Sequence, residues 1–238
     1  MSHILALDVG TSSVRAAVYD TGANVLPETV VKIDRTVNFT DDGGAELDAE
    51  TAFEQVCEAI DQVFEKFDGE VSRVAMSCFW HSLVGIDSNS APTTPVYTWA
   101  ETRPAKYVQQ LRDSLDEAAI HNRTGAQFHS SFWTAKLLWL RNENPEVFRT
   151  TKRWLSFSDY LTLKLSGFIK TSISMASGSG LLDLRKSCWD LELLEFLGVD
   201  EAQMPEIAAD SFSFTSSKWE QLRNAKWLPA IGDGAANN

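Results

Sequence analysis

The chain has 238 residues, of which 44% are hydrophobic and 23% charged, and its formal net charge is −12. This length and composition are typical of a soluble globular protein with one large domain or two small ones. The negative charge argues against a general nucleic-acid or anionic-membrane binder, because both partners require a basic protein face.

Cysteine usage and the N-terminus indicate a cytoplasmic protein. The three cysteines, Cys57, Cys78 and Cys188, are widely spaced and form no metal-binding pattern, so we expect reduced thiols and no zinc site. The first apolar run is interrupted by Asp8 and has no basic leader, unlike a signal peptide. No apolar stretch is long enough to span a bilayer.

The N-terminal segment predicts a β-meander. Residues 4–8 form a short apolar strand, residues 14–20 a second, and residues 25–33 a third after a turn at 20–24. The first hairpin therefore holds Gly10-Thr11-Ser12 directly after a strand that ends near Asp8. P-loop and Rossmann proteins instead place their glycine loops between a strand and a helix. The hairpin favours an α/β domain of the ribonuclease H-like, actin-like ATPase type, with a mixed sheet and flanking helices.

The rest of the chain alternates helices with short strands. A helix is predicted from the N-cap Asp48 to Asp68-Gly69, because apolar residues recur at three- and four-residue steps. The other expected elements are strands at 71–78, 83–86, 96–99 and 227–231, helices at 104–115 and 189–197, a mostly helical region at 132–165, and loops at 88–95 and 172–180, the latter read as a loop or frayed helix.

Two aspartates follow apolar strands beside small residues. Asp8 precedes Gly10, Thr11 and Ser12, a combination that suits Mg²⁺ and phosphate binding. Asp233 stands in Gly232-Asp233-Gly234-Ala235-Ala236, where a carboxylate could take a proton from an attacking hydroxyl. Each has a simpler interpretation as a turn residue, and their pairing favours the functional one.

Two further segments combine aromatic and polar side chains. Trp80-His81-Ser82 follows the strand at 71–78, and Trp99-Ala100-Glu101-Thr102-Arg103 follows the strand at 96–99. An aromatic face with imidazole, carboxylate and guanidinium groups could bind a polyol. Taken alone, the first segment is better explained by a satisfied histidine at a strand end, and the second by a surface Glu-Arg pair at a helix start.

Together these motifs resemble the FGGY-type carbohydrate kinases, over essentially the whole chain. The resemblance is carried by the order and spacing of Asp8-Val9-Gly10-Thr11-Ser12, Gly44-Ala45-Glu46, His81-Ser82, Trp99-Ala100-Glu101-Thr102-Arg103, Arg123-Thr124-Gly125, Ala135-Lys136-Leu137-Leu138-Trp139-Leu140, Asn144-Pro145-Glu146-Val147-Phe148, Asp159-Tyr160-Leu161, Ala176-Ser177-Gly178-Ser179-Gly180-Leu181-Leu182-Asp183 and Gly232-Asp233-Gly234-Ala235-Ala236. The pattern looks most like the gluconokinase branch, with xylulokinases as the nearest competitor.

The resemblance implies ATP-dependent transfer of a phosphoryl group to a hydroxyl of a sugar or sugar acid, gluconate-like first and xylulose-like second. It implies Asp233 as the catalytic base. The implied sugar-binding residues are Trp80, His81, Trp99, Glu101 and Arg103. The residues implied to bind ATP phosphates are Asp8, Gly10, Thr11 and Ser12, with Mg²⁺ at Asp8.

Two positions depart from the usual family pattern. The family commonly has Asp at the position of Glu101, and Met or Gln at the position of Trp80. An indole there is expected to narrow the sugar pocket or to add a stacking face. Both departures bear on which sugar is used.

The resemblance also implies a second, adenosine-binding domain. We expect residues 1–238 to form the N-terminal, sugar-binding domain, with the C-terminal domain absent except for its possible start near 233–238, and the chain alone to be inactive or very weak. The expected partners are a sugar or sugar acid, ATP and that domain; a homodimer is left open, and no nucleic acid or membrane is expected. The alternatives are a non-catalytic sugar-binding or regulatory module and another actin-like ATPase.

Overall fold

A mixed β-sheet forms the centre of the computed structural model, which describes residues 2–209 and 212–237. The strand order is β14-β6-β1-β2-β3, and β15 also pairs with β6. The strands are β1 (His3–Val9), β2 (Ser13–Tyr19), β3 (Val31–Asp34), β6 (Val71–Cys78), β14 (Lys226–Trp227) and β15 (Ile231–Gly232). β1, β6, β14 and β15 run parallel, whereas β2 and β3 are antiparallel to their neighbours. The predicted mixed sheet and opening meander are confirmed.

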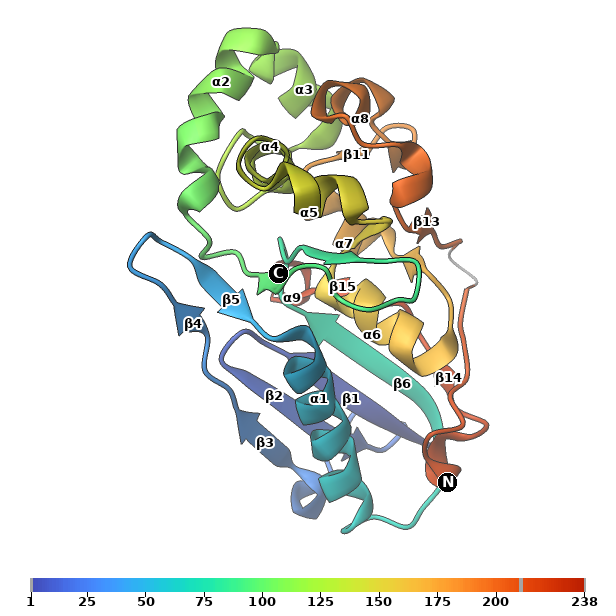
Figure 1. The fold of residues 1–238 in the computed structure, drawn as a ribbon. Helices are drawn as coiled ribbons and strands as arrows, with labels where there is room; N and C mark the ends of the chain where they lie inside the picture. The colour runs from blue at the N-terminus through green and yellow to red at the C-terminus, as the bar shows by residue number, and fades with distance from the viewer. Residues whose placement is uncertain (1, 210–211, 238) are drawn as a thin grey trace.

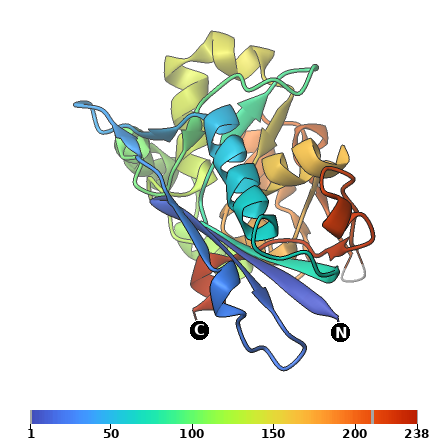
Figure 2. The same ribbon diagram turned by 90° about the horizontal axis from the view of Figure 1, so that it is seen from below.

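One face of this sheet carries the larger core. Leu5, Leu7 and Val9 alternate along β1 and are at most 2% exposed. Ile4 and Ala6 are partly exposed, so the continuous apolar run, which is typical of a strand buried on both faces, here has only one buried face. The three buried residues pack with α1 (Ala49–Phe64) and α6 (Phe157–Ser166), which lie on the same side of the sheet (Figures 1 and 2). The predicted N-cap is confirmed, because the Asp48 side chain accepts a hydrogen bond from the Thr51 amide.

Most of the remaining helices form a second part of the molecule with its own core (Figure 1). Its helices are α2 (Lys106–Ser114), α3 (Glu117–Thr124), α4 (Trp133–Glu143), α5 (Pro145–Thr150) and α8 (Leu191–Leu197). Short helices α7 (Ile173–Ser177) and α9 (Asp233–Ala236) lie nearer the sheet. The short strands outside the central sheet are β4 (Asn38–Phe39), β5 (Ala45–Leu47), β7 (Val84–Ile86), β8 (Val96–Tyr97), β9 (Arg153–Leu155), β10 (Lys170–Thr171), β11 (Leu182–Asp183), β12 (Cys188–Trp189) and β13 (Glu206–Ile207).

Prolines account for two corrections to the predicted strands. The strand expected at 25–33 begins only at Val31, because Pro27 starts a 3-10 turn over Pro27–Thr29. The strand expected at 227–231 is divided into β14 and β15, with Pro229 between them. Proline has no N–H and cannot continue a hydrogen-bonded ladder. Both halves of the divided strand still pair with β6.

Three further differences concern helices. The first helix ends at Phe64 rather than at Asp68-Gly69. β9 interrupts the region at 132–165, because residues 153–155 pair with β7. The helix α3 was not expected; of its eight residues only Ile120 and Thr124 are buried, so its sequence carries little periodic signal.

Among the described helices, none combines the length and apolar character needed to cross a membrane.

Candidate active site

Parallel strands bring the two predicted aspartates to the same edge of the sheet. β6 lies between β1 and β15. Its Ser77 pairs with Asp8 of β1 and with Ile231 of β15, and its Cys78 pairs with Val9 and Gly232. Asp233 follows directly, at the first position of α9. Neighbouring strands lie about 4.8 Å apart, so the backbones that carry the two aspartates are separated by roughly 10 Å.

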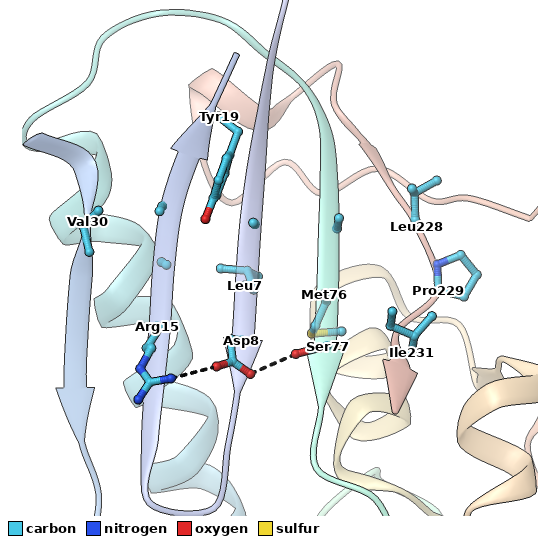
Figure 3. Close-up of a pocket in the computed structure, with 14 residues that line it drawn as sticks. Leu7, Asp8, Arg15, Tyr19, Val30, Met76, Ser77, Leu228, Pro229 and Ile231 are labelled. Atoms are coloured by element: carbon cyan, nitrogen blue, oxygen red, sulfur yellow. Dashed lines mark hydrogen bonds and ion pairs between the residues drawn. The ribbon is translucent and has the colours of Figure 1, made fainter. Parts of the chain in front are cut away.

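Asp8 is half exposed and already has two partners. Its Oδ1 accepts a hydrogen bond from Ser77 Oγ at 2.9 Å. Its Oδ2 lies 3.4 Å from Arg15 Nη1, and 51% of the aspartate side chain is exposed. A cavity of about 530 Å³ opens beside these residues, on the sheet face opposite the core (Figure 3). The residues that line this cavity include Ile231, but not His81, Trp99 or Asp233.

The hairpin after Asp8 is held by its own backbone. The Gly10 amide donates to the Ser13 carbonyl at 2.9 Å, and the Ser12 carbonyl accepts from the Arg35 amide at 2.9 Å. The Gly10 N–H therefore has an intramolecular acceptor and is not free to bind a phosphate oxygen. Thr11 is half-buried and Ser12 exposed, so their hydroxyls are accessible donors in this hairpin.

The Asp233 carboxylate is oriented by two amides. Its Oδ1 accepts from the Trp80 backbone N–H at 3.2 Å and from the Gly234 N–H at 2.8 Å. No hydrogen bond to Oδ2 is found within residues 2–209 and 212–237. The residue that the sequence singled out as a base thus lies directly beside the Trp80-His81 segment.

The Trp80 indole packs against the backbone beside Asp233. Its Nε1 donates to the Ser174 carbonyl at 3.0 Å. A Cβ built on Gly178, Gly232 or Gly234 would come within 2.6, 1.7 or 2.8 Å of the indole. The ring therefore occupies a space that these three glycines leave open.

His81 has a strained backbone and a partly buried ring. Its φ is +64°, a left-handed conformation that is uncommon outside glycine. Its Nδ1 lies 2.5 Å from the Gly178 carbonyl oxygen, and its ring meets the Phe132 ring edge-on at 4.6 Å between centroids. Burial lowers the pKa of His81, against the opposing effect of the Gly178 hydrogen bond. Because a carbonyl can only accept, Nδ1 carries the proton, and Nε2 of the neutral ring is an acceptor for a hydroxyl.

Glu101 and Arg103 form an internal ion pair. Glu101 is 0% exposed; its carboxylate accepts from Arg103 Nε at 2.8 Å and Nη2 at 2.7 Å, and from the Ala45 amide at 3.2 Å. Arg103 also contacts Glu46, and its guanidinium lies 4.8 Å from the Trp139 ring centroid. The Glu101 carboxylate therefore binds other parts of the protein, and these hydrogen bonds stabilise the loop at 98–102.

Trp99 differs from its neighbours, because 53% of its side chain is exposed. Its carbonyl accepts a hydrogen bond from Ser131 Oγ at 2.8 Å. Its backbone is therefore fixed while its ring stays accessible to a ligand. The structure thus places Trp80 in contact with the Asp233 carboxylate and beside the His81 ring.

Lys136 was not singled out as a site residue, although it connects two of the predicted site segments. The side chain is 0% exposed, and Nζ donates to the His81 carbonyl at 2.6 Å and the Thr98 carbonyl at 2.7 Å. Burial lowers the pKa of Lys136 to about 7. The available signal was a lysine within the apolar run Trp133–Leu140, where a charged residue needs buried polar partners.

Asp8 has the features of a partial Mg²⁺ site. Within the described part of the chain, no group of three or more His, Cys, Asp or Glu side chains is placed to hold a metal ion. Mg²⁺ in nucleotide sites commonly keeps its waters and takes one or two carboxylates together with phosphate oxygens. A single half-exposed carboxylate fits that mode, with Arg15 as a competing cation.

Comparisons with known proteins agree on one family. Residues 3–223 match the model of the FGGY family of carbohydrate kinases, N-terminal domain. The chain is 29% identical over 243 aligned positions to a xylulose kinase of Lactococcus lactis. It superposes on a gluconate kinase of Lactobacillus acidophilus with a TM-score of 0.92 and 30% identity, and on a xylulose kinase of the same organism with 0.92 and 29%.

The matches cover nearly all of this chain and about half of each relative. The L. lactis match spans 100% of this chain and 48% of the relative. The two structural matches span 98% and 99% of this chain, and 48% and 49% of the solved chains. The similarity confirms the predicted actin-like fold.

Proposed function

Because the chain belongs to the FGGY family of carbohydrate kinases, we propose that it supplies the sugar-binding and catalytic-base half of an ATP-dependent sugar kinase. Residues 1–238 correspond to the N-terminal domain in this proposal. The part of the relatives that this chain does not cover would supply most of the ATP site. The observation that carries the proposal is the contact between the Asp233 carboxylate and the Trp80-His81 segment at the carboxyl edge of the sheet.

Asp233 is proposed to take the proton from the attacking sugar hydroxyl. Its Oδ1 is held by two amides, so Oδ2 is the oxygen that would meet the substrate. Phosphoryl transfer depends mainly on positioning and on charge stabilisation, and a carboxylate fixed in one orientation serves that need. Among the predicted site residues it has the geometry of a general base.

The sugar is proposed to lie among His81, Trp99 and Arg103. His81 Nε2 would accept a hydrogen bond from a hydroxyl, and the exposed Trp99 ring would cover an apolar face of the sugar. Arg103 would contribute Nη1, which lies 4.0 Å from its ion-pair partner Asp42. Trp80 and Glu101 remain proposed sugar-site residues, although their polar groups contact the protein.

Asp8, Gly10, Thr11 and Ser12 are proposed to face the phosphates of ATP. Asp8 would hold Mg²⁺, directly or through water, and the metal would offset phosphate charge when bound. The Thr11 and Ser12 hydroxyls would donate to phosphate oxygens. We propose gluconate, or a related sugar acid, as the first substrate and xylulose as the second, in a cytoplasmic protein.

A thermal-shift panel with gluconate, xylulose and glycerol tests the sugar site on this chain. A ligand present at 100 times its Kd stabilises the folded state by about 2.7 kcal/mol. For a chain of this size we expect the melting temperature to rise by roughly 5–10 °C. The rise should be smaller in Asp233→Ala and His81→Ala, and unchanged in the control Asp87→Ala.

The outcomes separate the proposal from its rivals. If gluconate or xylulose stabilises the parent and both site variants respond less, the sugar site is in this half. If His81→Ala responds like the parent, the sugar lies elsewhere and the proposed site is wrong. A polyol response that Asp233→Ala leaves unchanged would favour a non-catalytic sugar-binding module.

A further inference from the structure

The closest packing beside the candidate base is made by three glycines around one indole. The ring of Trp80 lies against Gly178 at the end of α7, Gly232 at the end of β15 and Gly234 in α9. Gly178 and Gly232 have φ of −65° and −68°, which any residue adopts. What requires glycine at 178 and 232 is therefore space for the indole rather than backbone conformation.

Hydrogen bonds join the same segments around the ring. Trp80 Nε1 donates to the Ser174 carbonyl at 3.0 Å, and Ser174 Oγ accepts from the Gly232 amide at 3.0 Å. The Trp80 backbone N–H also donates a hydrogen bond, to Asp233 Oδ1 at 3.2 Å. The indole thus connects α7 to the turn from β15 into α9, and the backbone of the same residue holds the carboxylate.

We infer that Trp80 is the positioning residue of Asp233, acting as a wedge that fixes the turn from β15 into α9 and so the direction of the carboxylate. The inference rests on the proposed role of Asp233 as the base. It assigns to the Trp80 ring a function other than stacking on the sugar. Rings are stiff and have few rotatable bonds, so an indole seated on three glycines leaves the Gly232–Gly234 backbone little freedom.

The direct test measures hydrogen exchange of the residue-80 backbone amide in labelled protein by NMR. In the parent this amide should exchange at least about tenfold more slowly than in Asp233→Ala, which removes its acceptor. Gly232→Ala should lose the same protection, because the new Cβ would lie 1.7 Å from Nε1 and must displace the ring. Trp80→Met should also lose this protection, since a rigid ring no longer fills the space between Gly178, Gly232 and Gly234.

A double variant and two controls separate positioning from general destabilisation. Trp80→Met combined with Gly232→Ala should be less damaging than the sum of the two changes, because the methyl group introduced at position 232 then has room. Leu194→Ala removes buried side chain in the other core and should lower the melting temperature without a selective loss at residue 80. Gly22→Ala, in the turn at 20–24, should change neither measurement.

The same variants show whether positioning affects ligand binding. With gluconate and xylulose as probes, Gly232→Ala should lose at least about two thirds of the parent's thermal shift, and the double variant should recover part of it. Unchanged amide exchange in both Trp80→Met and Gly232→Ala would overturn the inference. If Trp80→Met and Gly232→Ala selectively lose exchange protection at residue 80 but no polyol stabilises the parent, the positioning role of Trp80 is upheld. That result would count against the proposed function instead.

Discussion

At the scale of single residues, the buried ammonium of Lys136 is the least expected feature. Its Nζ donates to the carbonyl of His81, in one segment predicted to contact the sugar, and to that of Thr98, directly before the other. Lys136→Met should lower the free energy of unfolding by about 1–3 kcal/mol, because it removes the donor to the His81 carbonyl and the shorter of the two hydrogen bonds to the Thr98 carbonyl, which keeps the Glu101 amide at 3.3 Å. Urea denaturation measures this loss.

The matched control is the exposed Lys152. Lys152→Met should change the free energy of unfolding by less than about 0.5 kcal/mol. The Lys136 variant should also weaken any thermal shift caused by gluconate or xylulose, since the two sugar-site loops are no longer tied together. Equal stability of the two variants would show that the carbonyls find other donors.

The protonation of Lys136 gives a separate prediction for pH. Burial lowers its pKa to about 7, against the opposing effect of Glu101, whereas lysine in an unfolded chain titrates near 10.4. Between these values the unfolded state binds more protons, so stability rises with pH. The difference in unfolding free energy between the parent and Lys136→Met should therefore grow in favour of the parent from about pH 7 to 10. A difference that is constant over this range would refute the shift.

At the scale of elements, the start of α6 combines a helix cap with a buried acid. The Ser156 amide donates to Asp159 Oδ2 at 2.9 Å, and the Asp159 amide donates to Ser156 Oγ at 3.2 Å. Burial raises the pKa of Asp159 to about 6. The capping bonds stabilise the helix end, while the charged form of the buried carboxyl group costs free energy.

Asp159→Asn should change how stability depends on pH. Because the folded pKa is raised, the folded state binds more protons between about pH 4 and 6, and parent stability falls as pH rises through that window. The asparagine variant lacks this fall and keeps an acceptor for the Ser156 amide. Its stability relative to the parent should increase by up to about 1.4 kcal/mol per pH unit. Urea denaturation at several pH values measures both stabilities. If the unfolding free energies of the two proteins change with pH in the same way, the prediction is wrong.

Elements with a strong local signal were predictable from the sequence. α1 has a regular apolar face and a capping aspartate, and β1 is a short apolar run. The breaks at Pro27 and Pro229 also follow from proline chemistry, but the continuing apolar pattern concealed them. β9 could not be predicted, because residues 153–155 form a strand only through pairing with β7.

The candidate site was predictable in identity more than in arrangement. The motifs selected Asp8, His81 and Asp233, and parallel pairing with β6 brings both aspartates to one edge. The sequence offered Glu101 and Arg103 as a surface pair; the pair is present, but Glu101 is 0% exposed, because Arg103 also packs against Glu46 and Trp139. The glycine slot for Trp80 is likewise formed by segments about 50–150 residues apart in the chain.

At the scale of the whole molecule, one sheet face differs from the other. The face away from α1 has a floor of small residues, Ala6, Ala17 and Ala75, beside the exposed apolar side chains Val30 and Leu228 (Figure 3). An apolar surface of this kind should bind a neutral hydrophobic dye such as Nile red. We expect the paired changes Val30→Gln and Leu228→Gln to reduce dye fluorescence.

The control for the dye measurement is Leu191→Gln, which alters an exposed leucine on α8. It should leave the fluorescence nearly unchanged, because a single exposed apolar side chain does not form a patch. Equal loss in the control and in the paired variant would mean that the dye does not select this face. Sedimentation of the parent would show in the same preparation whether the chain is a monomer or the homodimer left open by the sequence.

The last prediction concerns the division of the reaction between two halves. This chain spans 48% of the L. lactis xylulose kinase, and we propose that most of the ATP site belongs to the remainder. Positioning the phosphoryl donor against the sugar hydroxyl accounts for most of the rate in such reactions. The chain alone should therefore bind its sugar yet form no detectable sugar-dependent ADP, against about 1–100 s⁻¹ for typical kinases. Sugar-dependent ADP formation that Asp233→Asn abolishes would confirm the base but refute this division, because residues 1–238 would then hold a complete nucleotide site.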